Sequence, residues 1–345
     1  MRKVLVIGLL LTAVIYILPV FCGLLEQEEP LSIPQESVVA DAEITESPPA
    51  EGEQTVTGES IVANGEITVL VDGEARTMKL EDYVVSVVAG EIAPDFPTEA
   101  IRAQAVAART YALYKQKTGR PAQHEEADVC DDPAHCAAFV DLKTEAAARW
   151  GEQANTAQDV IRQAVEDTAG QVLTYEGEPI VAVFSSAAGE KTERAVDVWG
   201  SDIPYLQSVD SPGGEACPKY YDAVVLTADE ICERAAKTLP SADLSGDPSG
   251  WFKASERSEA GGIGRMKFGG VEGKGTGMRT LLGLNSTNFT VKIDGNTLTF
   301  TTTGYGHGVG LSQWGAKYSA EQGQTYDEIL AHYYPGTTLT TISTE

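Results

Sequence analysis

The stretch Glu81-Asp-Tyr-Val-Val-Ser-Val-Val-Ala-Gly-Glu91 predicts a helix, because its apolar residues recur at the spacing of one helical face. Prolines follow shortly afterwards and predict that this helix ends near Glu91. A second helix is predicted for Thr98–Lys117, where Thr98 can cap the start and alanine is abundant. So many small side chains are typical of a closely packed central helix. Glu91 then lies at the end of the first helix, just ahead of the second.

Strand patterns flank this helical pair on both sides of the sequence. Ile67–Leu80 alternates around an Asp-Gly turn and predicts a β-hairpin. Further predictions, in chain order, are an interrupted helix over Glu145–Thr168, a hairpin over Val172–Tyr175 and Ile180–Phe184, a strand over Ala223–Leu226, a helix over Ala228–Thr238, a turn-rich subdomain boundary over Ser241–Gly250 and strands between Trp251 and Gly304. The sequence therefore predicts an α+β fold of mixed helices and antiparallel sheets, in one large domain or two packed subdomains.

The first sixty residues have a different composition. Val4–Leu25 carries no charge and is long enough to cross a bilayer, so residues 1–25 are predicted to form a transmembrane anchor rather than a cleaved signal peptide. Two cations precede it and acids follow it, which places the C-terminal part outside the cytoplasm. Residues 26–60 hold ten acidic residues and no Lys or Arg, a composition typical of a disordered linker. Residues 61–345 then form the extracytoplasmic domain, tied to the cell membrane by a single helix.

The charge balance excludes one class of partner. The formal net charge is −26, and the basic residues form no long run. Since binding to phosphate backbones needs clustered cations, no nucleic-acid partner is expected.

Several motifs resemble one known family. Residues 81–91 and the segment Glu99-Ala-Ile-Arg-Ala-Gln-Ala-Val-Ala-Ala-Arg-Thr-Tyr111 resemble the signature of the stage II sporulation protein D family. Gly304-Tyr-Gly-His-Gly-Val-Gly-Leu-Ser-Gln-Trp-Gly-Ala316 and Ile329-Leu-Ala-His-Tyr-Tyr-Pro-Gly336 resemble its closing motif. The resemblance implies a lytic transglycosylase that cleaves peptidoglycan glycan strands, notably strands stripped of their stem peptides, during engulfment in spore-forming bacteria. It also implies other engulfment proteins as partners, including a cell-wall amidase.

Glu91 is the expected catalytic acid and base. Cleavage of a glycosidic bond needs a carboxylic acid held neutral by apolar surroundings, and Glu91 follows an apolar helix and matches the Glu of the family motif. A lytic enzyme can use one carboxylate, because the C6 hydroxyl of the sugar is already tethered beside the anomeric carbon. A hydrolase would need a second carboxylate, for which Asp95 and Glu99 are the nearest candidates in the sequence.

Polar residues on the second predicted helix are candidates for substrate binding. Arg102 and Arg109 are two turns apart and face nearly the same side, where they could bind muramic acid carboxylates, while Gln104 points elsewhere. The alternative is that both arginines form ion pairs with Glu99 or other local acids. The family usually has Lys at the position of Arg102.

Two later segments add further candidates for substrate binding. Ser185 and Ser186 begin a small polar run that suits the wall of a groove. His307 and Gln313 lie in the glycine-dense closing motif, where the backbone can approach a sugar chain closely. A purely architectural turn is the alternative for this motif.

His124, Cys130 and Cys136 form a His-x5-Cys-x5-Cys array that suits zinc, and similar His and Cys positions occur in the family. We expect such a zinc to order the loop rather than to perform catalysis, with a fourth ligand position open to water or Glu91 and with His135 as a bystander. A disulfide between the two cysteines is the alternative. Cys217 and Cys232 form a second disulfide or remain two thiols.

A different functional class is also compatible with the motifs. Relatives in the wider family are named as modifiers of wall amidases, so the chain could be a non-catalytic peptidoglycan-binding enhancer or scaffold. The presence of Glu91 favours the enzyme.

Overall fold

The structure is a computed structural model in which residues 62, 63 and 65–344 are described. The predicted anchor (1–25) and linker (26–60) lie outside the described residues. Within 62–63 and 65–344, no helix combines the length and the apolar character needed to cross a bilayer. The described part mixes helices with several small sheets, which agrees with the predicted α+β class.

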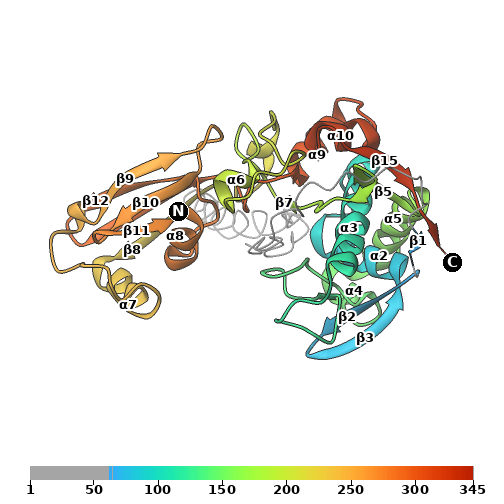
Figure 1. Cartoon of the computed structure of the whole chain (residues 1–345), viewed down its shortest axis with the longest axis horizontal. Coiled ribbons are helices and arrows are strands. Elements are labelled where there is room, and N and C mark those ends of the chain that lie inside the picture. The colour runs from blue at the N-terminus through green and yellow to red at the C-terminus, as the bar shows by residue number, and fades with distance from the viewer. Residues whose placement is uncertain (1–61, 64, 345) are drawn as a thin grey trace, which may run out of the picture. The chain divides into compact units, whose positions relative to one another are not determined.

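The helices and strands follow in mixed order along the chain (Figure 1). The helices are α2 Leu80–Glu91, α3 Thr98–Thr118, α4 Leu142–Trp150, α5 Ala154–Asp167, α6 Ala195–Val198, α7 Ala228–Thr238, α8 Gly275–Leu282, α9 Gln313–Glu321 and α10 Tyr326–Tyr333, with 3-10 turns η1 Gly151–Gln153, η2 Gly214–Ala216 and η3 Pro248–Gly250. The strands are β1 Val62–Ala63, β2 Glu66–Val71, β3 Glu74–Lys79, β4 Val129–Cys130, β5 Gln171–Tyr175, β6 Glu178–Pro179, β7 Phe184–Ser185, β8 Tyr221–Thr227, β9 Phe252–Arg257, β10 Ile263–Phe268, β11 Val271–Lys274, β12 Phe289–Asp294, β13 Thr297–Thr303, β14 Leu311–Ser312, β15 Thr338–Thr341 and β16 Ser343–Thr344.

The described residues build two hydrophobic cores. The first core takes its buried side chains from 67–220 and 305–342, and the second takes them from 226–300. The chain therefore leaves the first core after Tyr220 and returns to it at Gly304, where the Gly304 amide donates to the Tyr220 carbonyl at 2.8 Å. The boundary predicted at Ser241–Gly250 is wrong, because Ala242 and Leu244 of this stretch are partly buried and pack against the second core.

Helix α3 is the centre of the first core. It contacts α2, α5, α9, α10 and β5. Its alanines at 100, 103, 105 and 107 are completely buried. Because their side chains are small, neighbouring helices can pack close to the α3 backbone. The predicted helix over Thr98–Lys117 is thus confirmed, and so is its central position.

The hairpin turns follow the local sequence. Asp72 and Gly73 both have positive φ, at 52° and 79°, as the tight turn between β2 and β3 requires. Glu176 and Gly177 repeat this conformation between β5 and β6. The prediction of a strand over Ile180–Phe184 is wrong in extent, because the strands in this part of the chain are β6, which ends at Pro179, and β7, which begins at Phe184. Strand β7 instead pairs in parallel with β14, which aligns Ser185 with Ser312.

The second core packs helices against two antiparallel sheets. Sheet β12-β13-β8 and sheet β11-β10-β9 supply the strands, while α7 and α8 supply the helices (Figure 1). Helix α7 has the predicted bounds and begins with a capping box between Thr227 and Glu230. Helix α8 was not predicted, because it is short and contains glycine.

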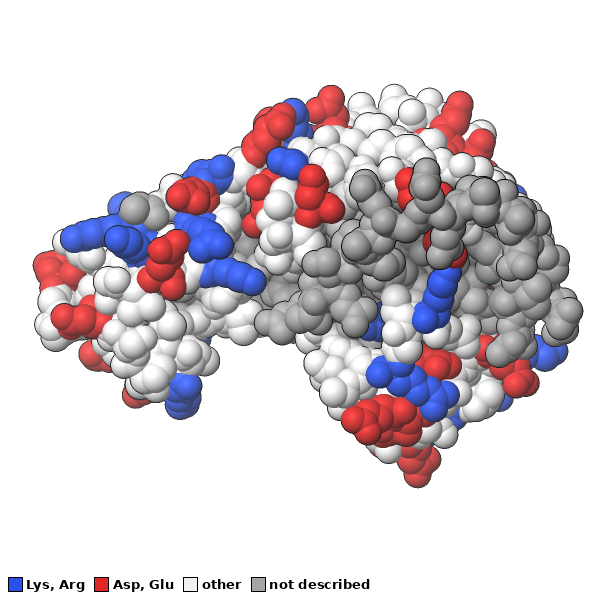
Figure 2. Space-filling model, in the orientation of Figure 1, with Lys and Arg blue, Asp and Glu red and all other residues white. Residues whose placement is uncertain are grey.

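Charged side chains of both signs are interspersed on the face shown in Figure 2.

Candidate active site

Glu91 is the last residue of α2 and is buried, with 4% of its surface exposed. Its Oε1 accepts a hydrogen bond of 2.8 Å from the backbone N–H of Ala138. Its Oε2 accepts a hydrogen bond of 2.9 Å from Nε2 of Gln313. A carboxyl group held at both oxygens has a fixed orientation, as proton transfer to a bound group requires.

The end of α2 packs tightly against the loop that follows β4. A side chain at Gly90 would place its Cβ 2.7 Å from the carbonyl oxygen of Ala138, so this contact needs glycine. Arg149 of α4 donates from Nη2 to the Gly90 carbonyl at 3.1 Å. These contacts fix the backbone on both sides of the helix end and hence the position of Glu91.

Arg149 also contributes to the electrostatics of the site. Burial lowers the pKa of its guanidinium group, and the nearby carboxylates of Glu145 and Glu91 oppose this effect. The guanidinium group of Arg149, on α4, therefore places a positive charge near Glu91.

Gln313 reaches Glu91 from the start of α9. Ser312 caps this helix, since its Oγ accepts from the Gly315 N–H at 3.3 Å, and it also accepts from the Ala188 N–H at 3.1 Å. The Trp314 N–H donates to the Ser186 carbonyl at 3.0 Å. From the sequence, the segments around Ser185 and around Gln313 were separate candidates for substrate binding. In the structure, hydrogen bonds join these two segments side by side.

Ser185 and Ser186 are both buried. Within the described residues, the Ser185 hydroxyl has no hydrogen-bond partner, while the Ser186 hydroxyl lies 3.8 Å from the Cys217 sulfur. The predicted contact of these serines with substrate stays a prediction.

His307 is buried, and its Nδ1 accepts from the Val309 N–H at 3.0 Å. Burial lowers the pKa of His307 to about 3, and the charge of Arg279 acts in the same direction. The imidazole is therefore neutral near neutral pH. Its ring lies 5.2 Å from that of Trp199, so His307 packs the closing motif against the segment that follows α6.

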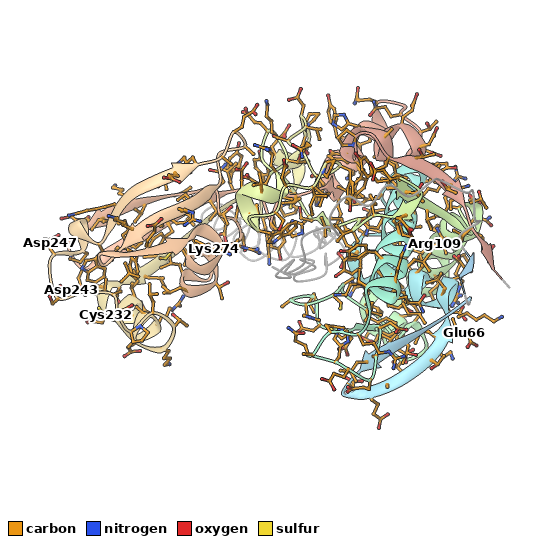
Figure 3. The ribbon with its side chains drawn as sticks, in the orientation of Figure 1. Glu66, Arg109, Cys232, Asp243, Asp247 and Lys274 are labelled. Carbon is orange, nitrogen blue, oxygen red and sulfur yellow. The ribbon has the colours of Figure 1, made fainter. Side chains whose placement is uncertain are left out.

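The arginines of α3 form ion pairs, as the alternative interpretation had it. Arg109 is completely buried and makes a two-pronged contact with Glu81, at 2.8 Å from Nε to Oε1 and 2.6 Å from Nη2 to Oε2. Figure 3 places Arg109 on α3, among the helices of the first core. Arg102 pairs with Glu99 at 2.5 Å and with Asp167. Both guanidinium groups are thus occupied within the fold.

Gln104 is completely buried, and neither atom of its side-chain amide has a hydrogen-bond partner within the part of the chain that the structure describes.

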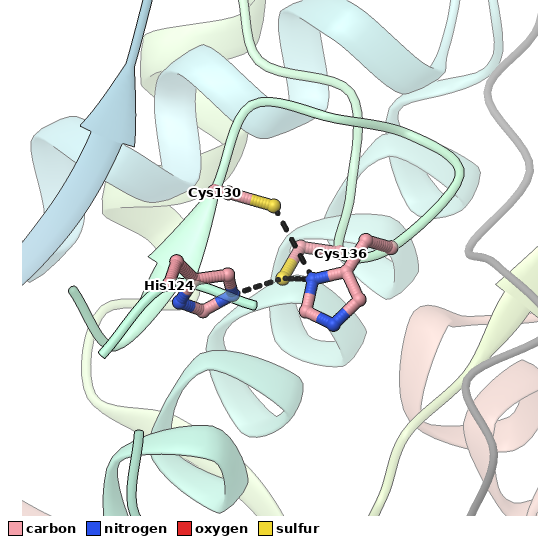
Figure 4. Close-up of side chains that lie close together, drawn as sticks. His124, Cys130 and Cys136 are labelled. Atoms are coloured by element: carbon pink, nitrogen blue, oxygen red, sulfur yellow. Dashed lines mark hydrogen bonds between the residues drawn. The ribbon is translucent and has the colours of Figure 1, made fainter. Parts of the chain in front are cut away.

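Four side chains converge in the loop around β4. The ligand atoms of His124, Cys130, His135 and Cys136 lie within 4.8 Å of one another, and all but His135 are buried. Figure 4 shows His124 and Cys130 converging on Cys136. The interpretation of His135 as a bystander is wrong, because its Nδ1 lies 3.4 Å from both sulfurs. A tight turn explains this, since the amides of His135 and Cys136 both donate to the Asp132 carbonyl.

The four groups fit a metal ion such as zinc. Tetrahedral zinc with sulfur at about 2.3 Å and nitrogen at about 2.0 Å needs sulfur–nitrogen separations of roughly 3.5 Å. The separations here are 3.4 Å to His135 and 3.5 Å to His124. His124 Nδ1 lies 2.8 Å from the Ala127 carbonyl, which leaves Nε2 facing Cys136 as a metal ligand would. With His135 included, the set of four is complete without Glu91.

All four described cysteines are free thiols. Cys130 and Cys136 share a hydrogen bond, which raises the pKa of Cys130 and lowers that of Cys136. Cys217 belongs to the first core, whereas Cys232 lies on α7 and packs against the second core (Figure 3). Of the two alternatives for this pair, a disulfide or two thiols, the structure has two thiols.

Two aromatic rings and a lysine lie in the segments that follow Glu91 and Gln313 in the sequence, and Trp314 and Lys317 were not among the predicted site residues. Phe96 and Trp314 make an edge contact with ring centres 5.2 Å apart, and Lys317 lies over both rings. The available signal was the spacing of Gln313 and Lys317, which places them on one face of α9.

The fold and the site together define an α+β protein in which the buried carboxyl group of Glu91 is held by two distant segments. The family profile described as Stage II sporulation protein matches residues 73–175. Stage II sporulation protein D of Bacillus subtilis (strain 168) is 36% identical over 264 residues, covering 76% of this chain and 75% of that protein. Its counterpart in Bacillus amyloliquefaciens is 36% identical over 261 residues, covering 76% and 74%. The chain therefore belongs to the stage II sporulation protein D family, as its motifs predicted.

A further relative carries a different name. The amidase enhancer of Bacillus subtilis (strain 168) is 32% identical over 302 residues, which cover 74% of this chain and 40% of that protein.

Proposed function

We propose that this protein is a lytic transglycosylase that cleaves peptidoglycan glycan strands during sporulation. The observation that carries the proposal is the setting of Glu91, a buried carboxyl group held at one oxygen by Ala138 and at the other by Gln313. Membership of the stage II sporulation protein D family supports the cell-wall setting. The preferred substrate is the glycan strand from which the stem peptides have been removed.

In the proposed reaction, Glu91 acts twice. It first gives its proton to the glycosidic oxygen as the bond from the anomeric carbon to that oxygen breaks. The resulting carboxylate then takes the proton of the C6 hydroxyl on the same muramic acid, whose oxygen bonds to the anomeric carbon. The products are a 1,6-anhydro-muramyl end and a strand with a new hydroxyl, and Glu91 is protonated again. No water is consumed, because the tethered hydroxyl takes its place.

The surroundings of the other two carboxylates favour this mechanism over a paired-carboxylate one. Asp95 is exposed to solvent. Glu99 accepts from Arg102 at 2.5 Å and from the Tyr326 N–H at 2.8 Å. Glu99 is thus engaged in holding α3 to α10, and a hydrolase would have to use an acid other than these two.

We propose a structural zinc at His124, Cys130, His135 and Cys136, where it would bind two thiolates and two imidazoles. Ala138, which donates to Glu91, lies two residues beyond Cys136. A fixed loop would keep this donor in place, so the metal would support catalysis by ordering the chain.

The cellular setting completes the proposal. Residues 1–25 would anchor the protein in the cell membrane with residues 61–345 outside the cytoplasm, tethered by the acidic segment 26–60. Substrate would then be the glycan of the wall, and other engulfment proteins, including a cell-wall amidase that strips peptides, would be partners.

The similarity to the amidase enhancer supports one alternative, a binding protein that stimulates an amidase without cleaving glycan itself. Full-length protein purified in detergent is incubated with peptide-stripped glycan strands, and the products are analysed by mass spectrometry. The enzyme predicts anhydro-muramyl ends with the native protein and none with Glu91→Gln, whose thermal melt checks folding. Binding without new ends would support the enhancer.

A further inference from the structure

Lys317 is held in an unusual position on α9. Its Nζ lies 4.7 Å from the ring centre of Trp314 and 5.0 Å from that of Phe96. Both distances are within the range of cation–π attraction, which holds an ammonium group over an aromatic face. The two rings contact each other edge to face at 5.2 Å, so they form a fixed support for the charge.

This support belongs to the same neighbourhood as the carboxyl group of Glu91. Phe96 lies in the short connection between Glu91 and α3, and Trp314 directly follows Gln313, the hydrogen-bond donor to Glu91. Lys317 lies one turn beyond Gln313 on the same face of α9. The ammonium group and the catalytic carboxyl group therefore share a wall built from α9 and the α2–α3 connection.

The ammonium group keeps the capacity to bind an anion. Aromatic faces attract its charge without accepting conventional hydrogen bonds, and the group has three donors. The side chain is 25% exposed, and the ion pair with Glu321 is long at 4.0 Å, with Glu321 half exposed. Such an exposed pair contributes little and gives way to a better placed carboxylate.

Three other cations, on α3 and α4, already have partners within the fold. Arg102 is paired with Glu99 and Asp167, and Arg109 is buried against Glu81. Arg149 donates to the Gly90 carbonyl. A chain with a net charge of −26 repels anions in general, so an anionic group can approach only where a cation compensates locally.

We propose that Lys317, supported by Phe96 and Trp314, is a binding subsite for the lactyl carboxylate of the muramic acid next to the cleaved bond. The assignment rests on the proposed glycan cleavage and names what the site recognises in its substrate. A stem peptide converts this carboxylate into a neutral amide, while removal of the peptide exposes the charge. Lys317 therefore distinguishes stripped strands from peptide-bearing ones.

The test separates binding from turnover by using full-length Glu91→Gln protein in detergent. Binding is measured to peptide-stripped glycan strands with free lactyl carboxylates and to the same strands after conversion of the carboxylates to methylamides. We expect about tenfold weaker binding to the methylamide strands, as for loss of one charged hydrogen bond. Equal binding to both strands would overturn the proposal, and this comparison needs no variant of Lys317.

Variants then assign the preference to Lys317. Lys317→Met should remove the preference for the carboxylate strands, and Lys317→Arg should retain most of it. The control Lys237→Met removes an exposed lysine from α7 in the second core and should leave the preference unchanged. A preference that persists in Lys317→Met refutes the assignment. Failure of the native protein to form anhydro ends would instead refute the proposed cleavage, because the binding comparison does not depend on turnover.

Discussion

Gln313 lies 222 residues beyond Glu91 in the sequence, yet its amide nitrogen donates to Glu91 Oε2 at 2.9 Å. This contact ties the closing motif of the chain to the end of its first described helix. The parallel pairing of β7 with β14 and the cap at Ser312 fix where α9 begins, and so they fix the position of Gln313 relative to Glu91. The site therefore depends on the whole first core, since no single segment of the chain contains it.

Replacement of Gln313 by Leu should lower the rate of strand cleavage by about tenfold or more, since it leaves one oxygen of a buried carboxyl group without its donor. The rate is measured from the release of anhydro-muramyl ends. Gln324→Leu, at an exposed position after α9, is the matched control and should retain full activity. Unchanged cleavage in Gln313→Leu would show that this hydrogen bond does not orient Glu91.

Replacement of Gly90 by Ala should reduce both stability and activity. The added Cβ would lie 2.7 Å from the Ala138 carbonyl oxygen and would push away the loop whose N–H holds Glu91. Overpacking of this kind costs about 1–3 kcal/mol of unfolding free energy. Gly277→Ala on α8, where a Cβ meets nothing within 4 Å, should be neutral or stabilising in the same denaturant titration. A Gly90→Ala protein as stable and active as the native one would contradict the tight contact.

The metal site predicts about one zinc per chain in protein purified without chelator, by elemental analysis. With His135 as the proposed fourth ligand, His135→Ala should weaken zinc binding, and changing both Cys130 and Cys136 to Ser should abolish it. Removal of zinc should lower the melting temperature and the cleavage rate together, since the same loop supplies Ala138. A peptide cross-linking Cys130 to Cys136 in non-reduced, metal-free protein would establish the disulfide instead.

His307 predicts a loss of stability in acid. Its pKa is about 3 in the folded protein and 6.5 when unperturbed, so the unfolded chain takes up a proton first as the pH falls. Stability is fully present above pH 6.5 and falls toward pH 3, with a slope of about 1.4 kcal/mol per pH unit from this group. Burial raises the pKa of Glu193 in the folded protein, so this group has the opposite effect: at pH values above its ordinary pKa, it makes the free energy of unfolding smaller as the pH rises.

The comparison with His307→Gln isolates the histidine, because Glu193 contributes to both proteins. Unfolding free energies measured between pH 7 and pH 4.5 should fall less steeply in the variant. Parallel slopes in the two proteins would show that His307 takes up its proton as readily in the folded state as in the unfolded chain.

Local features of the fold were predictable from the sequence. Helix α3 and the turn at Asp72 and Gly73 depend on neighbouring residues alone, and both have the predicted structure. The position of Glu91 at the end of an apolar helix was likewise predicted, and its catalytic role stays a prediction. The start of α7 follows from its capping box, whose two residues the sequence contains.

Features that depend on distant contacts were not predictable in the same way. The parallel pairing of β7 with β14 has no local signal, and neither does the contact of Gln313 with Glu91. Spacing suggested that Arg102 and Arg109 face substrate, but acids from other segments, Asp167 and Glu81, lie against them in the fold. His135 joins the group of potential metal ligands through a turn at Asp132 that its position next to Cys136 did not indicate.

The most direct test of the account is cleavage of peptide-stripped glycan strands in ¹⁸O-labelled water, with the new ends analysed by mass spectrometry. If Glu91 acts alone and the C6 hydroxyl attacks the anomeric carbon, the new ends are 1,6-anhydro-muramyl groups without label. A hydrolase with paired carboxylates adds water and gives labelled reducing ends. Unlabelled anhydro ends that disappear in Glu91→Gln are the predicted result, and predominantly labelled reducing ends would contradict the lytic mechanism.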